Sequence, residues 1–232
     1  MRARLVAGIK RLLLLVAGAF LVYELWFFGW VLWWGRVDPG MTRFMEMRAA
    51  EIRAVDPARA LKKNWVAYSA VSVHLKRALI ASEDGKFLYH QGFDWQGIRH
   101  AAEVNARRGR VVAGGSTITQ QLAKNLFLSP EKTPLRKIQE ALITLMIEST
   151  WEKRRIFEVY INVIEWGDGV FGAEAAARHY FGVSANRLSP AQAAYLAAMV
   201  PRPRYYERHR DAQDLRRKSV VVLARMPLAR IP

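Results

Sequence analysis

The sequence contains no cysteine, which excludes disulfides, thiolate nucleophiles and cysteine-ligated zinc. It also has no HExxH motif, no GxSxG motif with a triad and no EF-hand loop, and its five histidines are scattered. Metalloproteases and serine hydrolases are therefore excluded as well. Strand-like alternation of apolar and polar residues is nearly absent, and no repeat or low-complexity tract interrupts the chain after residue 60. These absences leave a mainly helical protein whose chemistry depends on carboxylates.

Basic residues outnumber acidic ones, with 36 Lys and Arg against 20 Asp and Glu in 232 residues and a net charge of +16. The hydrophobic fraction of 52% excludes global disorder, because burial of that much apolar surface can offset the entropy of ordering. The length suits one ordinary domain with some residues to spare. This charge indicates an anionic partner. Composition alone does not decide whether the partner is nucleic acid, anionic lipid or a phosphorylated substrate.

One long apolar run, LLLLVAGAFLVYELWFFGWVLWW, covers residues 12–34 and contains a single charged side chain, Glu24. As a helix it spans roughly 34 Å, enough to cross a hydrocarbon core of about 30 Å. Tryptophans gather in its second half, as in an aromatic belt at a membrane interface. The run predicts an uncleaved membrane anchor. A cleaved signal peptide is the alternative, but the small-x-small tripeptide at 17–19 lies inside the apolar run.

The basic residues before this run place the N-terminus in the cytoplasm by the positive-inside rule; they are Arg2, Arg4, Lys10 and Arg11. The exported remainder has 32 basic and 19 acidic residues, a net charge of +13. Outside the membrane, anionic lipid or a lipid-linked phosphate is a nearer partner than nucleic acid. The predicted organisation is a basic tail at 1–11, an anchor at 12–34, a juxtamembrane connector with a short helix at 35–60 and a folded domain at 61–232.

Helical periodicity predicts that the folded domain is mainly α and large enough to have a core. Ser189 and Pro190 give the last predicted helix an N-cap and a proline in its first turn. The predicted helices cover 72–83, 117–128, 136–152, 153–164 and 190–200.

The first candidate site is the sequence Ser82-Glu83-Asp84-Gly85, at the end of a predicted helix that Gly85 is suited to cap. A carboxylate at the negative end of a helix dipole is disfavoured by roughly 0.3–1 kcal/mol, which suits a group that accepts a proton. Glu83 is therefore a candidate general base. The alternative is a solvated pair of acids at an ordinary helix end, and His90 is expected to be structural.

The second candidate site begins at Gly114-Gly115, before a helix start where Thr117 and Gln120 have the spacing of a capping box. Free backbone N–H groups at such a helix start can hold an anion. Side chains at i, i+3 and i+4 share one helical face. Here they are Gln121, Lys124 and Asn125. The alternative is a well-capped helix with a polar outer face.

The third candidate site is Arg136, Lys137 and Glu140, on a polar stripe that continues through Thr144 and Glu148. Two cations beside one carboxylate leave spare positive charge for an anionic leaving group. The alternative is a surface ion-pair triplet that is worth only a few tenths of a kcal/mol per pair.

Five segments together resemble the motifs of the family 51 glycosyltransferases, the peptidoglycan glycosyltransferases; they are EDGKFLYHQGFD, GGSTITQQLAKNLFL, RKIQEALITLMIE, KRRIFEVYIN and GDGVFGAEAAARHYFG. The resemblance covers about residues 65–200. The chain has no KTG signature of a penicillin-binding transpeptidase, so it resembles the monofunctional biosynthetic branch. Gly85 departs from the Arg or similar polar residue that often follows the Glu-Asp pair in the family.

The resemblance implies an inverting transfer. Glu83 would take the proton from the 4-hydroxyl of the acceptor GlcNAc in lipid II, and that oxygen would attack the anomeric carbon of the donor MurNAc. Undecaprenyl diphosphate would leave, assisted by Glu140, which would position Arg136 and Lys137. Further substrate-binding residues would be Ser116, Gln121, Lys124 and Asn125, with Arg110 and Lys153 as additional phosphate contacts.

The resemblance also implies a lysozyme-like helical fold with a small membrane-proximal lobe. The expected partners are lipid II, the growing glycan strand, membrane lipids and other wall-synthesis proteins, in the bacterial inner membrane with the catalytic domain outside. No metal site or cofactor is required by the sequence, although Mg²⁺ or Mn²⁺ is compatible with a diphosphate. The alternatives are a lysozyme-like hydrolase or lytic transglycosylase and a non-catalytic membrane-anchored scaffold.

Overall fold

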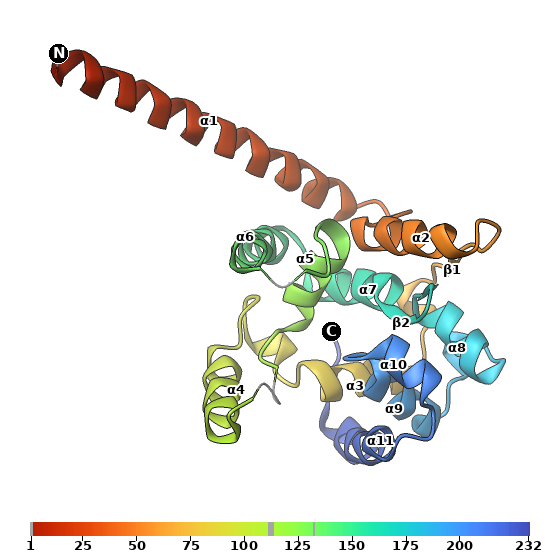
Figure 1. Cartoon of the computed structure of the whole chain (residues 1–232). Coiled ribbons are helices and arrows are strands. Elements are labelled where there is room, and N and C mark those ends of the chain that lie inside the picture. Colours follow the sequence, from red (N-terminus) through yellow and green to blue (C-terminus); the bar gives the residue numbers. More distant parts are fainter. Residues whose placement is uncertain (1, 111–113, 132) are drawn as a thin grey trace. The chain divides into compact units, whose positions relative to one another are not determined.

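The computed structural model describes residues 2–110, 114–131 and 133–232 of the chain, which divides into two compact units, Met1–Asp38 and Pro39–Pro232 (Figure 1). The boundary falls shortly after the predicted anchor. The unit Pro39–Pro232 therefore includes the short helix that the sequence predicts within 35–60.

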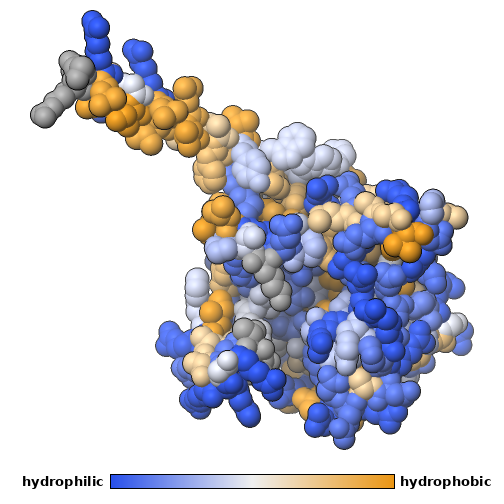
Figure 2. Space-filling model, in the orientation of Figure 1, coloured by the Kyte–Doolittle hydropathy of each residue, from blue (hydrophilic) through white to orange (hydrophobic). Residues whose placement is uncertain are grey.

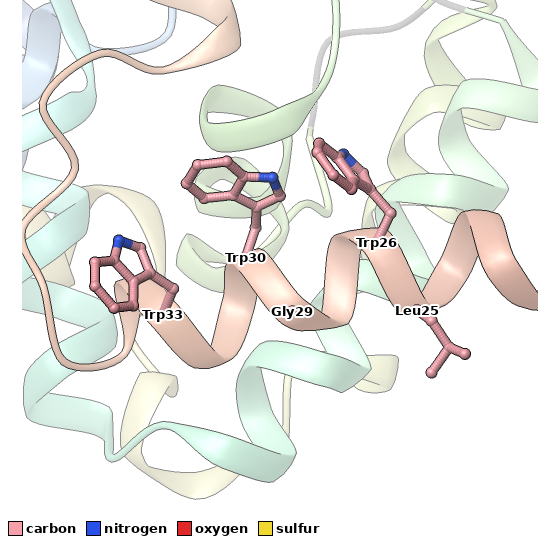
Figure 3. A pocket seen from close by; sticks show the side chains of 5 residues that line it. All are labelled: Leu25, Trp26, Gly29, Trp30 and Trp33. Carbon is pink, nitrogen blue, oxygen red and sulfur yellow. The ribbon is translucent and has the colours of Figure 1, made fainter.

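The first unit is one continuous helix, α1 (Arg2–Trp34), whose segment Arg4–Trp34 is long and apolar enough to cross a membrane. Its apolar side chains are exposed along the helix, as the orange surface of α1 in Figure 2 shows. Trp26, Trp30 and Trp33 project from one side of α1 around Gly29, whereas Leu25 points to the other side (Figure 3). The tryptophans cluster because positions i, i+4 and i+7 share a helical face. These features confirm the predicted apolar helix as a candidate membrane span.

The second unit is mainly helical, as predicted. Four of its helices begin and end within one residue of the predicted bounds, and α6 begins and ends two residues earlier than its prediction. The helices are α2 (Arg43–Val55), α3 (Val73–Glu83), α4 (Trp95–Arg108), α5 (Ile118–Phe127), α6 (Pro134–Thr150), α7 (Lys153–Val163), α8 (Ala173–Phe181), α9 (Pro190–Met199), α10 (Pro203–Arg208) and α11 (Gln213–Arg225).

Helix starts follow the predicted capping chemistry. Thr117 and Gln120 form a reciprocal capping box at the start of α5, and Ser189 forms another with Gln192 before α9. The predicted glycine cap of α3 is wrong. Helix α3 ends on Asp84, whose φ of −159° is extended, and Gly85 is not among the glycines with a positive φ. A different interaction, described below, holds this helix end.

The helices of the folded unit pack in two groups. Helix α5 packs against α2, α6 and α7, and α9 packs against α3 and α11 (Figure 1). The largest fully buried side chains are Trp166, Tyr160, Phe87, Phe157 and Phe171. Burial of each large apolar side chain stabilises the fold by about 1.5–3 kcal/mol, so this interior fixes the helices that carry the polar residues.

A small sheet with the strand order β1-β3-β2 complements the helices. Strand β1 (Lys62–Lys63) pairs in parallel with β3 (Val170–Phe171), and β3 is antiparallel to β2 (Glu165–Gly167). The turn between β2 and β3 requires glycine at position 169, where φ is +76° and an added Cβ would lie 2.7 Å from Ile52 Cδ1.

Strand β2 buries a carboxylate. Glu165 Oε2 lies 3.3 Å from Arg48 Nε of α2, and burial raises the pKa of Glu165 to about 7 although Arg48 and Arg204 oppose the shift. Because the folded-state pKa exceeds the unfolded one, Glu165 stabilises the fold relatively more at low pH. This contribution is lost as the pH rises through about 7.

We expect Glu165→Gln to remove this pH dependence. Between pH 5 and pH 8, the stability of the variant relative to wild type should rise by about 2 kcal/mol, since the neutral amide has no charge to bury. Denaturant unfolding of the detergent-solubilised full chain at both pH values measures the difference. A constant offset between the two proteins would contradict the prediction.

Candidate active site

Glu83 is the last residue of α3, and its side chain is only 8% exposed. Its Oε1 lies 2.9 Å from the Ser82 hydroxyl, and its Oε2 accepts a hydrogen bond of 3.0 Å from Gln121 Nε2. Lys218 Nζ of α11 lies 3.7 Å from Oε1. The carboxylate is therefore held from three elements, which fixes the direction in which it faces.

The amide of Gln121 is itself oriented by a buried tyrosine of α7. Tyr160 donates a hydrogen bond of 3.0 Å from its hydroxyl to Gln121 Oε1, so the Gln121 NH₂ group is turned toward Glu83. Burial raises the pKa of Tyr160 well above its ordinary value, and the charges of Glu83 and Asp84 raise it further. The tyrosine therefore stays a protonated donor at neutral pH.

Asp84 explains how α3 ends. Its Oδ2 accepts a hydrogen bond of 3.0 Å from the backbone N–H of Ile118, in the first turn of α5. The same carboxylate lies 3.0 and 3.1 Å from His90 Nε2. A carboxylate at a helix N-terminus is stabilised by the helix dipole. Asp84 thus joins the end of α3 to the start of α5, and His90 has the structural role that the sequence predicts.

Glu140 lies at the centre of a second group and is 3% exposed. Arg136 Nη1 lies 2.5 Å from its Oε2, and Lys137 Nζ pairs with its Oε1 and also donates to Ser116 Oγ at 3.2 Å. The Lys137–Ser116 contact joins the second and third candidate sites.

Lys124 of α5 interacts electrostatically with Glu140, Arg136 and Lys137. Burial lowers the pKa of Lys124, while the negative charge of Glu140 raises it and the positive charges of Arg136 and Lys137 lower it. Arg136 and Lys137 pair with Glu140, and Lys124 responds to the charge of Glu140 and, more weakly, of Glu165, so cations outnumber the acids of this group, as suits an anionic ligand.

The structure places the other predicted residues as follows. The side-chain amide of Asn125 donates a hydrogen bond of 2.7 Å to the backbone carbonyl of Gln121, one turn earlier in α5. Lys153 Nζ lies 2.8 Å from Glu148 and 4.6 Å from the Phe87 ring centre, in a mostly buried ion pair. Arg110 is exposed beyond α4.

A cavity of about 140 Å³ lies beside Glu83, and the segment that begins at Gly114 and Gly115 forms part of its wall. An added Cβ at Gly115 would lie 3.0 Å from Ile98 Cα, so glycine at this position favours the close approach of this segment to α4. The residues that line the cavity are Glu83, Asp84, Gly85, Lys86, Asp94, Gly97, Gly114, Gly115, Ser116 and Thr117. Across residues 2–110, 114–131 and 133–232, no group of three or more His, Asp or Glu side chains is arranged to hold a metal ion.

Sequence reasoning missed Tyr160 and Lys218 as neighbours of the Glu83 group. Burial lowers the pKa of Lys218, while the charge of Glu83 raises it. Lys218 is one of three consecutive basic residues of α11, with Arg216 and Arg217, and no local spacing connects that helix with α3.

The profile of the family described as Transglycosylase matches residues 49–227. The chain belongs to the transglycosylase family.

Three relatives of this transglycosylase are named "Biosynthetic peptidoglycan transglycosylase". The protein of Dechloromonas aromatica is 62% identical over 224 residues, which cover 97% of both chains. The protein of Laribacter hongkongensis is 56% identical over 98% of both chains. The protein of Chromobacterium violaceum is 54% identical over 96% of this chain and 97% of its own. The similarity thus includes the N-terminal helix as well as the folded unit.

We expect Asp84→Asn to destabilise the transglycosylase by about 1.5–3 kcal/mol, because it replaces a charged acceptor shared by Ile118 N–H and His90 with a neutral amide. Denaturant unfolding measures the loss. Asp56→Asn is the matched control, since Asp56 is an exposed aspartate at the end of α2. Equal stability of the two variants would contradict the role of Asp84.

Proposed function

We propose that this transglycosylase is a peptidoglycan glycosyltransferase that polymerises lipid II into glycan strands. The observation that carries the proposal is the arrangement of two buried carboxylates, one oriented by an uncharged amide and the other surrounded by cations. The family membership and the names of the relatives support the same reaction class.

In the proposed reaction, Glu83 accepts the proton of the acceptor 4-hydroxyl as that oxygen attacks the anomeric carbon of the donor sugar. The bond between that carbon and the diphosphate oxygen breaks, and the configuration inverts. Gln121 orients Glu83 for this proton transfer, and Lys218 stabilises its charge before the proton arrives. General base catalysis of this kind contributes about 10²–10⁴-fold to a rate.

The leaving diphosphate is proposed to bind at Lys124, Arg136 and Lys137. Glu140 keeps these cations together in the absence of substrate, because like charges would otherwise repel. When the diphosphate binds, its charge completes the neutralisation of the group. Ser116 and Asn125 would contact the sugar-phosphate, and the exposed Arg110 would provide further positive charge. Lys153, whose charge is paired with Glu148, would add to it only where the phosphate replaces that partner.

We also propose that α1 anchors the enzyme in the bacterial inner membrane, with a cytoplasmic N-terminus and the folded unit outside. The basic residues before the apolar run support this orientation. Exposed leucine and isoleucine side chains on α6 support a membrane-proximal lobe, since they lie on the outer face of a helix whose inner face carries Glu140; they are Leu135, Ile138 and Leu145.

The decisive experiment compares wild type with Glu83→Gln on labelled lipid II. Wild type should form polymer, and the variant should polymerise lipid II at least about 100-fold more slowly, because glutamine cannot accept the proton. Glu103→Gln is the control and should retain wild-type activity, since Glu103 is an exposed acid of α4. Gel analysis of the labelled products measures polymer formation.

The same assay distinguishes the two alternative functions. Shortening of preformed glycan by wild type would replace the transferase with a hydrolase or lytic enzyme. No change in either substrate would indicate a scaffold.

A second prediction concerns the diphosphate. Lys124→Met should weaken binding of a lipid diphosphate at least about tenfold, but leave binding of a phosphate-free glycan nearly unchanged, because one charge-assisted contact is lost. Lys76→Met is the matched control, because Lys76 is also a lysine whose pKa is lowered by burial and its Nζ donates to the Tyr68 carbonyl. Equal losses for both ligands with Lys124→Met would exclude a phosphate role.

A further inference from the structure

A second cavity, of about 250 Å³, lies in the folded unit away from the residues that surround Glu83. Five charged residues line it, and none of them lines the cavity beside Glu83. We call it the arginine cavity; its residues are Arg59, Asp168, Arg204, Glu207 and Arg208.

The arginine cavity is built around the GDGVFG motif, which the proposed reaction does not use. Asp168 of this motif lies in the turn after β2, where its Oδ2 lies 2.9 Å from Arg59 Nη1 and its carbonyl accepts from Arg59 Nη2 at 2.6 Å. The Asp168 backbone N–H donates to Glu207 Oε2 at 2.5 Å. The turn thus holds an arginine from before β1 and a glutamate from α10 in one place.

Glycine at position 167 is required for this arrangement. An added Cβ there would lie 2.6 Å from the Tyr180 hydroxyl and 2.9 Å from Glu207 Cδ. Tyr180 donates from that hydroxyl to the Trp166 carbonyl at 2.7 Å, so the neighbouring atoms have little freedom to move away. The motif therefore positions charged groups in addition to forming a turn.

Both carboxylates of the cavity already have partners. Asp168 pairs with Arg59 and lies 3.4 Å from Arg204 Nε, and Glu207 Oε1 lies 2.8 Å from His179 Nε2. Three arginines against these two engaged acids leave the cavity with an excess of positive charge.

Arg208 carries this excess. Its Nε donates to the Arg204 carbonyl at 3.2 Å, and no carboxylate in the described part of the chain forms an ion pair with it. Its two terminal nitrogens are therefore available as a fork, the geometry that binds an oxyanion through two hydrogen bonds. Arg204 lies one helical turn earlier on α10, where its Nη1 forms an ion pair with Glu51 at 3.5 Å in addition to its contact with Asp168.

We propose that the arginine cavity binds a phosphate group, either a free phosphate ion or the phosphodiester of a lipid headgroup. A phosphate has enough oxygens to accept from the guanidinium groups of Arg208 and Arg204 together. The cavity volume leaves room for the ion and for part of an attached headgroup. The inference does not depend on the proposed transferase reaction, because the two cavities share no residue.

The test uses the detergent-solubilised full chain and two probes at constant ionic strength, inorganic phosphate and glycerophosphoglycerol. Isothermal titration calorimetry should detect saturable binding of at least one probe to wild type. Arg208→Gln should weaken it at least about tenfold, because a charged two-hydrogen-bond contact is lost. Arg225→Gln, a change of an exposed arginine on α11, should bind like wild type.

The two probes distinguish the sources of the phosphate. Binding of inorganic phosphate without the diester indicates a free ion, and binding of the diester indicates a headgroup. Equal binding by wild type and Arg208→Gln would overturn the proposal, as would failure of both probes to bind wild type. Glu83→Gln should bind the probe like wild type, so failure here is distinguishable from failure of the proposed reaction.

Discussion

The attachment of α3 to α5 through two adjacent carboxylates is the constraint on which the candidate site depends. Asp84 accepts from the backbone of the first turn of α5, and Glu83 accepts from a side chain one turn later. Because Asp84 satisfies the helix start, Glu83 is left at the cavity edge with only side-chain partners. Asp84 is held by the α5 backbone and His90, whereas Glu83 has the side-chain partners that the proposed proton transfer requires.

The two halves of the site differ in how they manage charge. Around Glu83 the hydrogen-bond donors are the uncharged Ser82 hydroxyl and Gln121 amide, and the cation Lys218 lies 3.7 Å away. Around Glu140 the neighbours are Arg136 and Lys137, with Lys124 close enough for its pKa to respond. A carboxylate that accepts a proton needs uncharged neighbours that orient it, whereas a site that binds an anion needs an excess of cations. Packing of α5 against both α6 and α7 brings the two environments together.

Local spacing predicted part of this arrangement correctly. The capping box of Thr117 and Gln120, and the shared face of Arg136, Lys137 and Glu140, depend on residues within one helical turn. The glycine cap of α3 was predicted wrongly, because a tertiary hydrogen bond to Asp84 made a left-handed cap unnecessary. The sequence predicted that Gln121 shares a face with Lys124 and Asn125, but not that its amide contacts Glu83 and Tyr160.

By itself, the sequence determined the apolar N-terminal helix, the mainly helical domain and the contacts between residues three or four positions apart. Backbone geometry fixes the distances between such close positions. Only the tertiary structure decided which distant groups meet. Lys218 reaches Glu83 from α11, and Arg59 reaches Asp168 from before β1. Such contacts depend on how the buried side chains of separate helices fit together, and no spacing along the chain encodes that fit.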